Sequence, residues 1–467
     1  MSLIERLSAI VGAENVLTRP DDVEAYFIDW RRRYHGSARC VVRPKTRDEV
    51  AGVVRACADA GVAMVPQGGN TSHCGAGIPG EDGKSVLISL SRMNGIRSID
   101  PTNNTLIAEA GCVLQTLHEA ASSVGRLFPL SLAAEGSCQI GGNLSTNAGG
   151  VHVLHYGTMR ELTLGLEVVL PNGEVWDGLR GLRKDNTGYD LKQLFIGAEG
   201  TLGIITAAVL KLFPQPRTTL TAWLAVESPT VALEVFGRLQ GAFGGALTAC
   251  ELISDVSVDL VCKHIPGSRP PLIEASPWQL LIELTDAGEN DSLLPALEDF
   301  LGEMLEKGVL TDAVLADGGE QARRLWALRE NIGEAQKAEG FSIKHDISVP
   351  VSRVAEFMKR ADAALARAFP GIRIVAFGHL GDGNLHYNQS KPDAAENSEF
   401  IKLQPRVNRI VYDIVNEFGG SISAEHGIGQ LKRGELLRYT SAVEVQTMRA
   451  IKDALDPQGL MNPGKVL

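Results

Sequence analysis

Glycine is concentrated in four short parts of this 467-residue chain, and this distribution constrains the fold more than any other sequence feature. The chain has fifty glycines, and clusters of them fall at 68–83, 136–150, 197–203 and 378–383, between apolar segments. Glycine permits backbone conformations and close approaches that a side chain would prevent. We therefore expect loops at these places in which the backbone lies close to a ligand or to another segment.

The first cluster follows a recognisable β-α-β pattern. A strand is expected at 40–43, and Thr46 and Glu49 form a capping-box pattern for a helix from about 47 to 60. Gly61 is placed to end that helix. The second strand, VAMVP, leads directly into QGGNTS at 67–72, whose backbone amides can cradle a pyrophosphate.

Two neighbouring motifs imitate nucleotide-binding loops. GAGIPG at 75–80 matches GxGxxG, but it contains Pro79 and leads to the strand SVLISL instead of a helix. GEDGKS resembles the end of a P-loop, but Ile78 stands where the first glycine belongs. We interpret both as plain turns. Because no GxGxxG opens a helix, a nicotinamide electron acceptor is not expected.

The second cluster lies in a segment with almost no charge. FPLSLAAEGSCQIGGNLSTNAGG, residues 128–150, contains only Glu135 as a charged residue. A long surface loop is the plain alternative, but such loops usually carry charge. A buried segment lying against a large flat ligand explains the composition better. A third small-residue segment, 196–214, combines a turn with a strand.

These segments together resemble a known family. PQGGNTS, PLSLAAEGSCQIGGNLSTNAGG, YGTMRELTLGLEVVLPNGEV and LFIGAEGTLGIIT are similar, in order, to the FAD-binding half of the p-cresol methylhydroxylase/vanillyl-alcohol oxidase superfamily, over about 38–214. The resemblance implies a non-Rossmann fold in which two α/β subdomains hold FAD. Asn70 stands where some relatives attach the flavin to histidine, and His73 lies further on, so non-covalent FAD is expected. The implied FAD-binding residues are Pro66, Gly68, Gly69, Asn70, Thr71, Ser72, Pro129, Gly136, Ser137, Gly141, Gly142, Asn143, Ser145, Thr146, Asn147, Gly150, Gly157, Glu199, Gly203, Ile204 and Asn462.

The fourth cluster lies between two histidines in AFGHLGDGNLHYN, residues 376–388. Asp382-Gly383 is a strong signal for a two-residue hairpin, which would set His379 opposite His386 on one sheet face. Two solvated histidines are the alternative. SISAEHGIGQLKR adds an adjacent Glu425–His426 pair. Two imidazoles and a carboxylate are the usual ligands of a catalytic zinc or a similar ion.

The second half also resembles one family. WALREN, KHDISVP, GHLGDGNLHYN, SAEHGIGQLKR and LDPQGLMNPGKVL are similar, in order, to the FAD-linked C-terminal domain of D-2-hydroxyacid dehydrogenases. The resemblance implies His379, His386 and Glu425 as metal ligands, His426 as the base, and Arg329, Lys344, Asn388 and His426 as substrate contacts. It departs at Gly333, where the hydroxyglutarate enzymes have threonine, although Arg324 can replace that contact.

The implied reaction is oxidation of a D-2-hydroxy acid to the 2-oxo acid. A divalent cation, zinc or manganese, would take the substrate hydroxyl, His426 would accept its proton, and the Cα hydride would pass to flavin N5. Substrates of the D-lactate, D-malate or D-2-hydroxyglutarate class all fit. An electron-transferring flavoprotein, a quinone or a similar acceptor would reoxidise the flavin.

The expected fold class is α+β. We expect a two-subdomain FAD-binding domain at 1–214, a substrate cap with an antiparallel sheet at 215–424, and a C-terminal segment, 425–467, that returns to the FAD-binding domain. The first seventeen residues predict a short amphipathic helix and not a secretion signal.

Composition excludes some functions. A net charge of −11 disfavours nucleic-acid binding, and no apolar run is long enough to span a bilayer. Seven dispersed cysteines favour a reduced, cytoplasmic compartment. A homodimer is a further expectation. Two alternatives remain at this point: a non-redox FAD-containing transferase of the same superfamily, and a non-enzymatic interaction protein held together by a structural metal.

Overall fold

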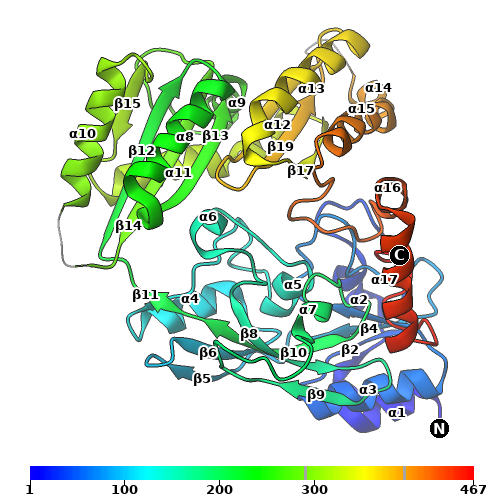
Figure 1. Ribbon diagram of the computed structural model, residues 1–467. Coiled ribbons are helices and arrows are strands. Elements are labelled where there is room, and N and C mark those ends of the chain that lie inside the picture. The colour runs from blue at the N-terminus through cyan, green and yellow to red at the C-terminus, as the bar shows by residue number, and fades with distance from the viewer. Residues whose placement is uncertain (289–291, 393–395) are drawn as a thin grey trace. The chain divides into compact units, whose positions relative to one another are not determined.

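A computed structural model describes residues 1–288, 292–392 and 396–467. The chain divides into two compact units (Figure 1). The first unit comprises residues 1–150, 157–215 and 425–467, and the second comprises 151–156 and 216–424. The chain therefore passes between the units four times, and residues 425–467 belong with the N-terminal half.

The first unit begins with a four-stranded sheet. Its order is β1 (Val16–Leu17), β2 (Cys40–Val42), β4 (Val86–Ser89) and β3 (Met64–Gln67), with β2, β4 and β3 parallel. Helices α1 (Leu3–Val11) and α3 (Arg47–Asp59) pack on one face, and α2 (Pro20–Phe27) packs on the other, because successive side chains of a strand such as Val41 and Val42 point to opposite faces.

The local predictions for this region are confirmed. Thr46 caps α3 by accepting a hydrogen bond from the amide of Glu49 at 3.2 Å. The amphipathic N-terminal helix is α1, and its capping box uses Ser2 and Glu5. A short 3-10 turn, η1 (Ala13–Asn15), connects α1 to β1.

A second sheet of the first unit has five antiparallel strands. Its order is β5 (Ile96–Asp100), β6 (Thr105–Glu109), β10 (Ile204–Lys211), β8 (Thr163–Val169) and β9 (Val175–Gly178). A small ribbon pairs β7 (Arg126–Leu127) with β11 (Phe213–Pro214). The other helices of this unit are α4 (Leu114–Ser122), α5 (Ile140–Ser145), α7 (Lys192–Phe195), α16 (Arg433–Tyr439) and α17 (Ala442–Leu455).

The C-terminal segment joins the first sheet at the edge of β3. The amide of Met64 donates to the carbonyl of Leu460 at 2.8 Å, and the amide of Asn462 donates to the carbonyl of Met64 at 2.7 Å. Met461 is completely buried in the core that α1 and α3 cover. This pairing places Asn462 beside the glycine-rich loop that follows β3.

The second unit is built on an antiparallel sheet, as the sequence predicted. Its order is β15 (Asp312–Leu315), β12 (Thr218–Val226), β14 (Trp278–Asp286), β13 (Leu247–Ser254), β18 (Arg373–His379), β19 (Asn384–Ser390) and β16 (Ser342–Ile343), and β17 (Asp346–Ser348) also pairs with β19. One core packs Trp223, Ile253 and Phe377 of the sheet against α9 (Asp255–His264), α11 (Gly319–Glu330) and α12 (Ile332–Glu339).

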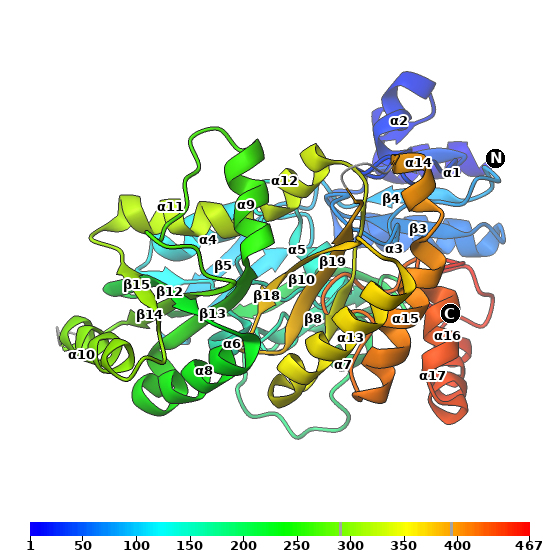
Figure 2. The ribbon, with the colours of Figure 1, turned by 90° about the horizontal axis from the view of Figure 1, so that it is seen from above.

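The remaining helices of the second unit surround this sheet. Helix α8 (Pro229–Phe243) packs against β12, β13 and β14, and α6 (Val153–Tyr156) packs against β13. Helices α13 (Val354–Ala368) and α15 (Gln404–Glu417) lie side by side (Figures 1 and 2). The others are α10 (Leu293–Glu306), α14 (Asn397–Ile401) and the 3-10 turns η2 (Gly244–Ala246) and η3 (Val351–Arg353).

The hairpin of β18 and β19 forms, but its predicted register is wrong by two residues. His379 is opposite Asn384, and His386 is opposite Phe377. The turn spans four residues because Asp382 accepts a hydrogen bond from the amide of Asn384 at 2.9 Å. A slip of two residues preserves the side-chain faces, so both histidines still lie on one face of the sheet.

None of the described helices has the length and apolar composition needed to cross a membrane.

Candidate functional site

The predicted FAD-binding residues all lie in the first unit, and the structure brings their segments together. A Cβ on Gly69 would lie 2.2 Å from the carbonyl oxygen of Ser137, so the loop after β3 packs backbone against backbone on the segment before α5. The turn before β10 joins them, because the amide of Glu199 donates to the carbonyl of Ser145 at 2.8 Å. The side chain of Asn462 donates to the carbonyl of Glu199 at 2.7 Å. The expected close approach of glycine backbone is thus present.

Three buried oxygen atoms at this junction make no hydrogen bond within the described chain. They are Oε1 of Gln139, Oδ1 of Asn143 and Oδ1 of Asn462. Buried polar atoms normally have partners. These acceptors fit a ligand that carries donors, and FAD offers its ribityl hydroxyls and the N–H of its flavin ring. The residues present therefore fit the cofactor.

Several polar side chains of the predicted list hold their own loops in place. Ser145 and Thr146 donate to the carbonyls of Gly141 and Gly142 at 2.7 and 3.1 Å. Asn70, in the left-handed conformation, donates to the carbonyl of Ile28 at 2.8 Å. Their side chains shape the cradle and leave the backbone to face a ligand.

Glu199 anchors the loop that carries His426. Its two carboxylate oxygens accept hydrogen bonds from the amides of Ile428 and Gly429 at 2.7 and 2.8 Å. Burial raises the pKa of Glu199, against the opposing effect of these two amides. The carboxylate of this predicted FAD-binding residue is thus committed to the C-terminal loop.

The same loop is packed against the first glycine cluster. The amide of Gln430 donates to the carbonyl of Cys74 at 2.8 Å, and a Cβ on Gly429 would lie 2.2 Å from that carbonyl oxygen. The half-buried imidazole of His426 stacks on His73, with ring centroids 4.1 Å apart and planes 9° apart. The Trp30 ring also contacts His73, edge to face, with ring centroids 5.1 Å apart. His426 is therefore held in a fixed orientation.

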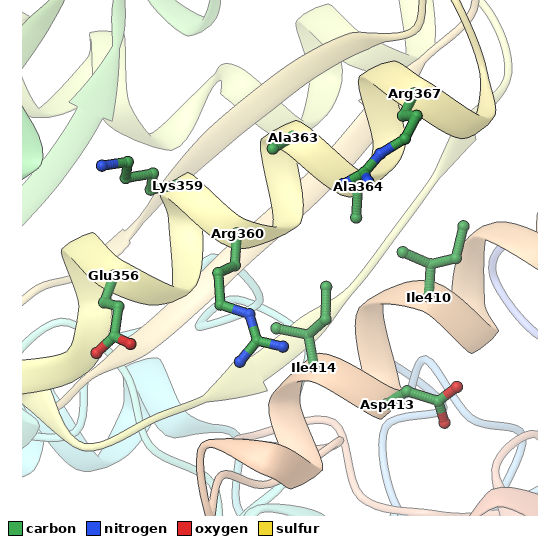
Figure 3. Close-up of a pocket in the computed structure, with 9 residues that line it drawn as sticks. All are labelled: Glu356, Lys359, Arg360, Ala363, Ala364, Arg367, Ile410, Asp413 and Ile414. Carbon is green, nitrogen blue, oxygen red and sulfur yellow. The ribbon is translucent and has the colours of Figure 1, made fainter.

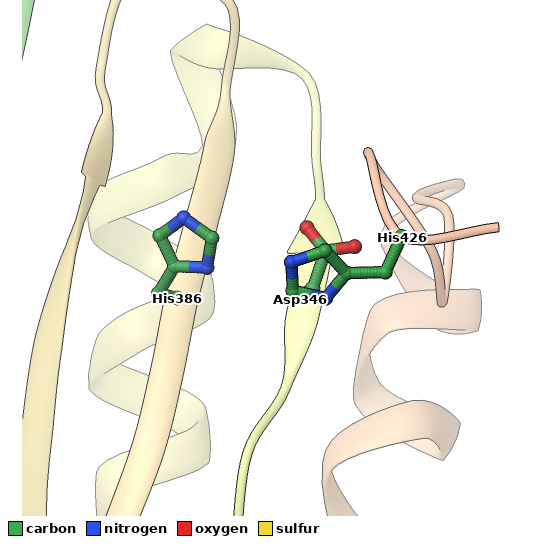
Figure 4. A group of neighbouring side chains, drawn as sticks. All are labelled: Asp346, His386 and His426. Atoms are coloured by element: carbon green, nitrogen blue, oxygen red, sulfur yellow. The ribbon is translucent and has the colours of Figure 1, made fainter. Parts of the chain in front are cut away.

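The two hairpin histidines form the centre of the candidate metal site in the second unit. His379 is buried and His386 half-buried, with ring centroids 6.0 Å apart and ring nitrogens within 4.8 Å of each other. Asp346 on β17 is directly opposite His386 on β19 (Figure 4). Its carboxylate also lies within 4.8 Å of a His386 ring nitrogen. Two imidazoles and a carboxylate fit a divalent cation.

Glu251 on β13 lies at the candidate site and was not predicted from the sequence. It is completely buried, its Oε1 accepts a hydrogen bond from Nδ1 of His379 at 2.5 Å, and its Oε2 accepts one from Nε of Arg329 at 2.6 Å. Burial opposes the charge, but the neighbouring His379 and Arg329 hold the pKa of Glu251 well below its usual range. Such a carboxylate contact on one ring nitrogen is the usual way in which the orientation of a metal-ligating imidazole is fixed. The available signal was a single charged residue, Glu251, in the strand TACELIS.

The predicted substrate-binding residues differ in burial and in the contacts that their side chains make. Arg329 is buried, with its guanidinium 4.7 Å from the Phe377 ring. Lys344 is half-buried between β16 and β17. Asn388 accepts from the amide of His345 at 3.0 Å and donates to Gln336 at 2.9 Å, so much of its amide serves the fold. Gly333, in α12, has open space around its Cβ position.

Glu425 is the first residue of the first unit's C-terminal segment. Just before it, Ser421 pairs with Ser348, and the amide of Ala424 donates to the carbonyl of Asp346 at 3.3 Å. The backbone that leads into Glu425 therefore runs beside β17, the strand that carries Asp346.

A separate cavity of about 510 Å³ lies between α13 and α15 (Figure 3). Ala363, Ala364 and Ile414 contribute apolar surface, and Lys359 and Arg367 contribute positive charge. None of the predicted site residues lines this cavity, so it is not part of the candidate functional site.

Two family descriptions match this chain. Residues 215–466 match the family described as "FAD linked oxidases, C-terminal domain", and residues 38–178 match the family described as "FAD binding domain". The chain belongs to the FAD-linked oxidase family. Both resemblances seen in the sequence are thereby confirmed, and the first unit contains an FAD-binding domain.

Similar proteins cover nearly the whole chain. A Bos taurus protein named "D-2-hydroxyglutarate dehydrogenase, mitochondrial" is 40% identical over 453 residues, which is 97% of this chain and 81% of the relative. A Xanthomonas citri pv. viticola protein named D-2-hydroxyglutarate dehydrogenase is 38% identical over 462 residues, 98% of this chain and 96% of the relative. Both relatives thus match nearly the whole of this chain.

The predicted fold class is also confirmed. A crystal structure of p-cresol methylhydroxylase aligns with a TM-score of 0.78 at 17% identity, covering 99% of this chain and 96% of that chain. A structure of alkyldihydroxyacetonephosphate synthase aligns with a TM-score of 0.74 at 18% identity, covering 99% and 84%. At such identities the likeness concerns the fold alone.

Proposed function

We propose that this family member is an FAD-dependent dehydrogenase that oxidises a D-2-hydroxy acid to the 2-oxo acid. The observation that carries the proposal is the similarity, over 97% and 98% of this chain, to two proteins named D-2-hydroxyglutarate dehydrogenase. Buried Glu251 binds the imidazole of His379, a proposed metal ligand, and the guanidinium of Arg329, a proposed substrate contact. This arrangement supports the same chemistry.

Three side chains would hold a divalent cation, zinc or manganese. They are His379 through Nε2, His386, and Glu425, with Asp346 beside His386 as a further carboxylate. When bound, the cation would lower the pKa of the substrate hydroxyl, and FAD would accept the hydride from Cα. Arg329 and Lys344 would bind the substrate carboxylate, Arg329 through the guanidinium donors that Glu251 leaves open.

His426 would accept the hydroxyl proton. A neutral imidazole near pH 7 suits this role. Stacking on His73 and the anchoring of the following residues by Glu199 would keep the ring oriented for proton transfer. A base of this kind works best when its geometry is set before substrate arrives.

The flavin would then pass its electrons to an acceptor other than a nicotinamide nucleotide. An electron-transferring flavoprotein, a quinone or a similar carrier would serve, since no GxGxxG of the sequence opens a helix. We include a homodimer as the working assembly.

The test is anaerobic flavin bleaching by a panel of D- and L-2-hydroxy acids, with and without prior removal of metal by a chelator. We expect bleaching by D-isomers alone and its loss after chelation. The variant His426→Ala should retain FAD but lose bleaching by at least about 100-fold. Normal bleaching in that variant would remove His426 from the mechanism. A yellow protein that no hydroxy acid bleaches would instead favour a non-redox reaction of FAD.

A further inference from the structure

Gln336 on α12 of the second unit is a completely buried amide with only one of its two polar groups bound. Its Oε1 accepts a hydrogen bond from Nδ2 of Asn388 on β19 at 2.9 Å. Its Nε2 is also buried and makes no hydrogen bond within the part of the chain that the structure describes. A buried donor without an acceptor destabilises a fold, so packing alone does not explain an amide at this position.

The backbone of His345 sets the orientation of both side-chain amides. Its N–H donates to Oδ1 of Asn388 at 3.0 Å. Because a backbone N–H can only donate, the atom of Asn388 that faces it must be the oxygen. Nδ2 of Asn388 therefore faces Gln336, and the atom of Gln336 that receives this donor must be Oε1. Turning either amide over would set a donor against a donor or an acceptor against an acceptor.

The two hydrogen-bonded amides lie on the sheet face that carries the candidate metal ligand His386. Asn388 and His386 are two positions apart on β19, so their side chains point to the same face. Their partners on β18, Val375 and Phe377, both belong to the core that α12 covers. Gln336 therefore reaches Asn388 from a helix that packs on this face, and every residue of the arrangement belongs to the second unit.

We propose that Gln336 is a positioning residue, which holds Asn388 so that the second N–H of Nδ2 is the group that binds a substrate oxygen. The inference rests on the proposed function, with Asn388 as the substrate contact predicted from the sequence. Nδ2 of Asn388 has two N–H bonds, and Gln336 accepts one of them. A carboxylate oxygen of the substrate can only accept, so the remaining N–H matches it. Gln336 thus makes Asn388 a donor toward the substrate.

The experiment removes the acceptor that Gln336 provides. Gln336→Met keeps the approximate volume of the side chain, and flavin reduction is measured with D-2-hydroxyglutarate. KM should rise by about 5- to 50-fold. The value of kcat should stay within about twofold, because a contact that binds substrate and transition state alike changes KM alone. An unchanged KM, or a loss confined to kcat, would overturn the inference.

A double variant decides whether Gln336 acts through Asn388. In the Asn388→Ala background, Gln336→Met should raise KM by less than about a further twofold, since the group that it positions is gone. Fully additive effects would contradict the proposal. Gln389→Met is the matched control, because Gln389 is completely buried and adjacent to Asn388, but its side chain points to the opposite face of the sheet. It should leave KM within about twofold, and an equal rise in this control would also count against the proposal.

A crystal structure of FAD-loaded Gln336→Met separates this inference from the proposed function, because it requires no turnover. Without its acceptor, the Asn388 amide should rotate or occupy two orientations, even if no hydroxy acid reduces the flavin. An Asn388 side chain that keeps its wild-type orientation would refute the positioning role. Where Gln336→Met loses FAD or lowers the melting temperature, Gln336→Leu repeats the measurements. A fold that tolerates neither apolar side chain would show that the amide serves stability, and this result too would refute the role.

Discussion

His379 and Glu251 are joined by a buried hydrogen bond of 2.5 Å between Nδ1 and a carboxylate oxygen. The other oxygen of Glu251 accepts from Arg329. One carboxylate therefore holds both the ring of a candidate metal ligand and the guanidinium of a candidate substrate contact in place. Neither residue can be reoriented without affecting the other.

Glu251→Gln should weaken metal binding and substrate binding together. An amide has one oxygen for two donors, so either His379 or Arg329 loses its partner inside the protein. We expect metal affinity to fall by about 10- to 100-fold and KM to rise. Metal content after dialysis against a graded chelator measures the first effect independently of activity. Glu283→Gln, which changes another largely buried carboxylate on the adjacent strand β14, is the control and should leave metal affinity unchanged. Full metal retention in Glu251→Gln would contradict the role.

Glu199→Gln should loosen the loop that carries His426. Its carboxylate satisfies two backbone amides, and a glutamine would turn an N–H toward one of them. We expect a loss of about 1–3 kcal/mol in unfolding free energy, a lower kcat and faster amide exchange at 426–430. Hydrogen exchange detected by mass spectrometry checks the local effect. Glu174→Gln, on an exposed turn of the same unit, serves as the control. Unchanged exchange at 426–430 would rule out anchoring by Glu199.

Gly142→Ala should separate FAD binding from folding. The Cβ position of Gly142 has no neighbour within 4 Å, although the surrounding loops are tightly packed. Alanine in helix α5 should leave the apoprotein as stable or more stable by up to about 1 kcal/mol. It should nevertheless lower FAD affinity at least about 10-fold if the cofactor fills that space. Gly237→Ala, in helix α8 with equally open surroundings, should raise stability without changing FAD content. Undiminished FAD affinity in Gly142→Ala would place the cofactor elsewhere.

Acid should abolish the stabilising effect of Glu339. Burial opposes its charge, but hydrogen bonds from Lys263, His264 and Arg373 outweigh it and lower the pKa of Glu339 from 4.5 to about 2. Because the folded-state pKa is the lower one, the stabilisation is complete above pH 4.5 and disappears as the pH falls toward 2. We expect Glu339→Gln to lower the free energy of unfolding by about 1–3 kcal/mol near neutrality. This difference from wild type should disappear as the pH falls from 4.5 toward 2. Denaturant unfolding at a series of pH values measures the gap, and Glu334→Gln on the exposed side of the same helix is the control. A gap independent of pH would refute the assignment.

Local signals were sufficient to predict some elements. Thr46 and Glu49 marked the start of α3 because capping depends on residues three positions apart. The alternating strand pattern placed His379 and His386 on one face of a hairpin. The register was missed because it depends on the Asp382 side chain bonding the amide of Asn384, an interaction that competes with the two-residue turn.

Contacts between residues distant in sequence could not be predicted in the same way. Glu251 lies 128 positions from His379, and nothing in its own strand identifies the partner. His73 and His426 stack on each other although most of the chain lies between them in sequence. Such pairings depend on how strands and loops are brought together, which periodicity does not encode.

The six residues 151–156 have a consequence for how this gene can be altered. They belong to the second unit, where His152 bonds Glu283 at 3.0 Å and Leu154 fills the space that a side chain at Gly381 would need. In a chimaera that exchanges only 216–424 for the equivalent part of a relative, the sheet of that relative would pack against α6 of this chain. Exchange of this unit between family members by recombination therefore requires two inserts, 151–156 together with 216–424, if the contacts of His152 and Leu154 are to be kept.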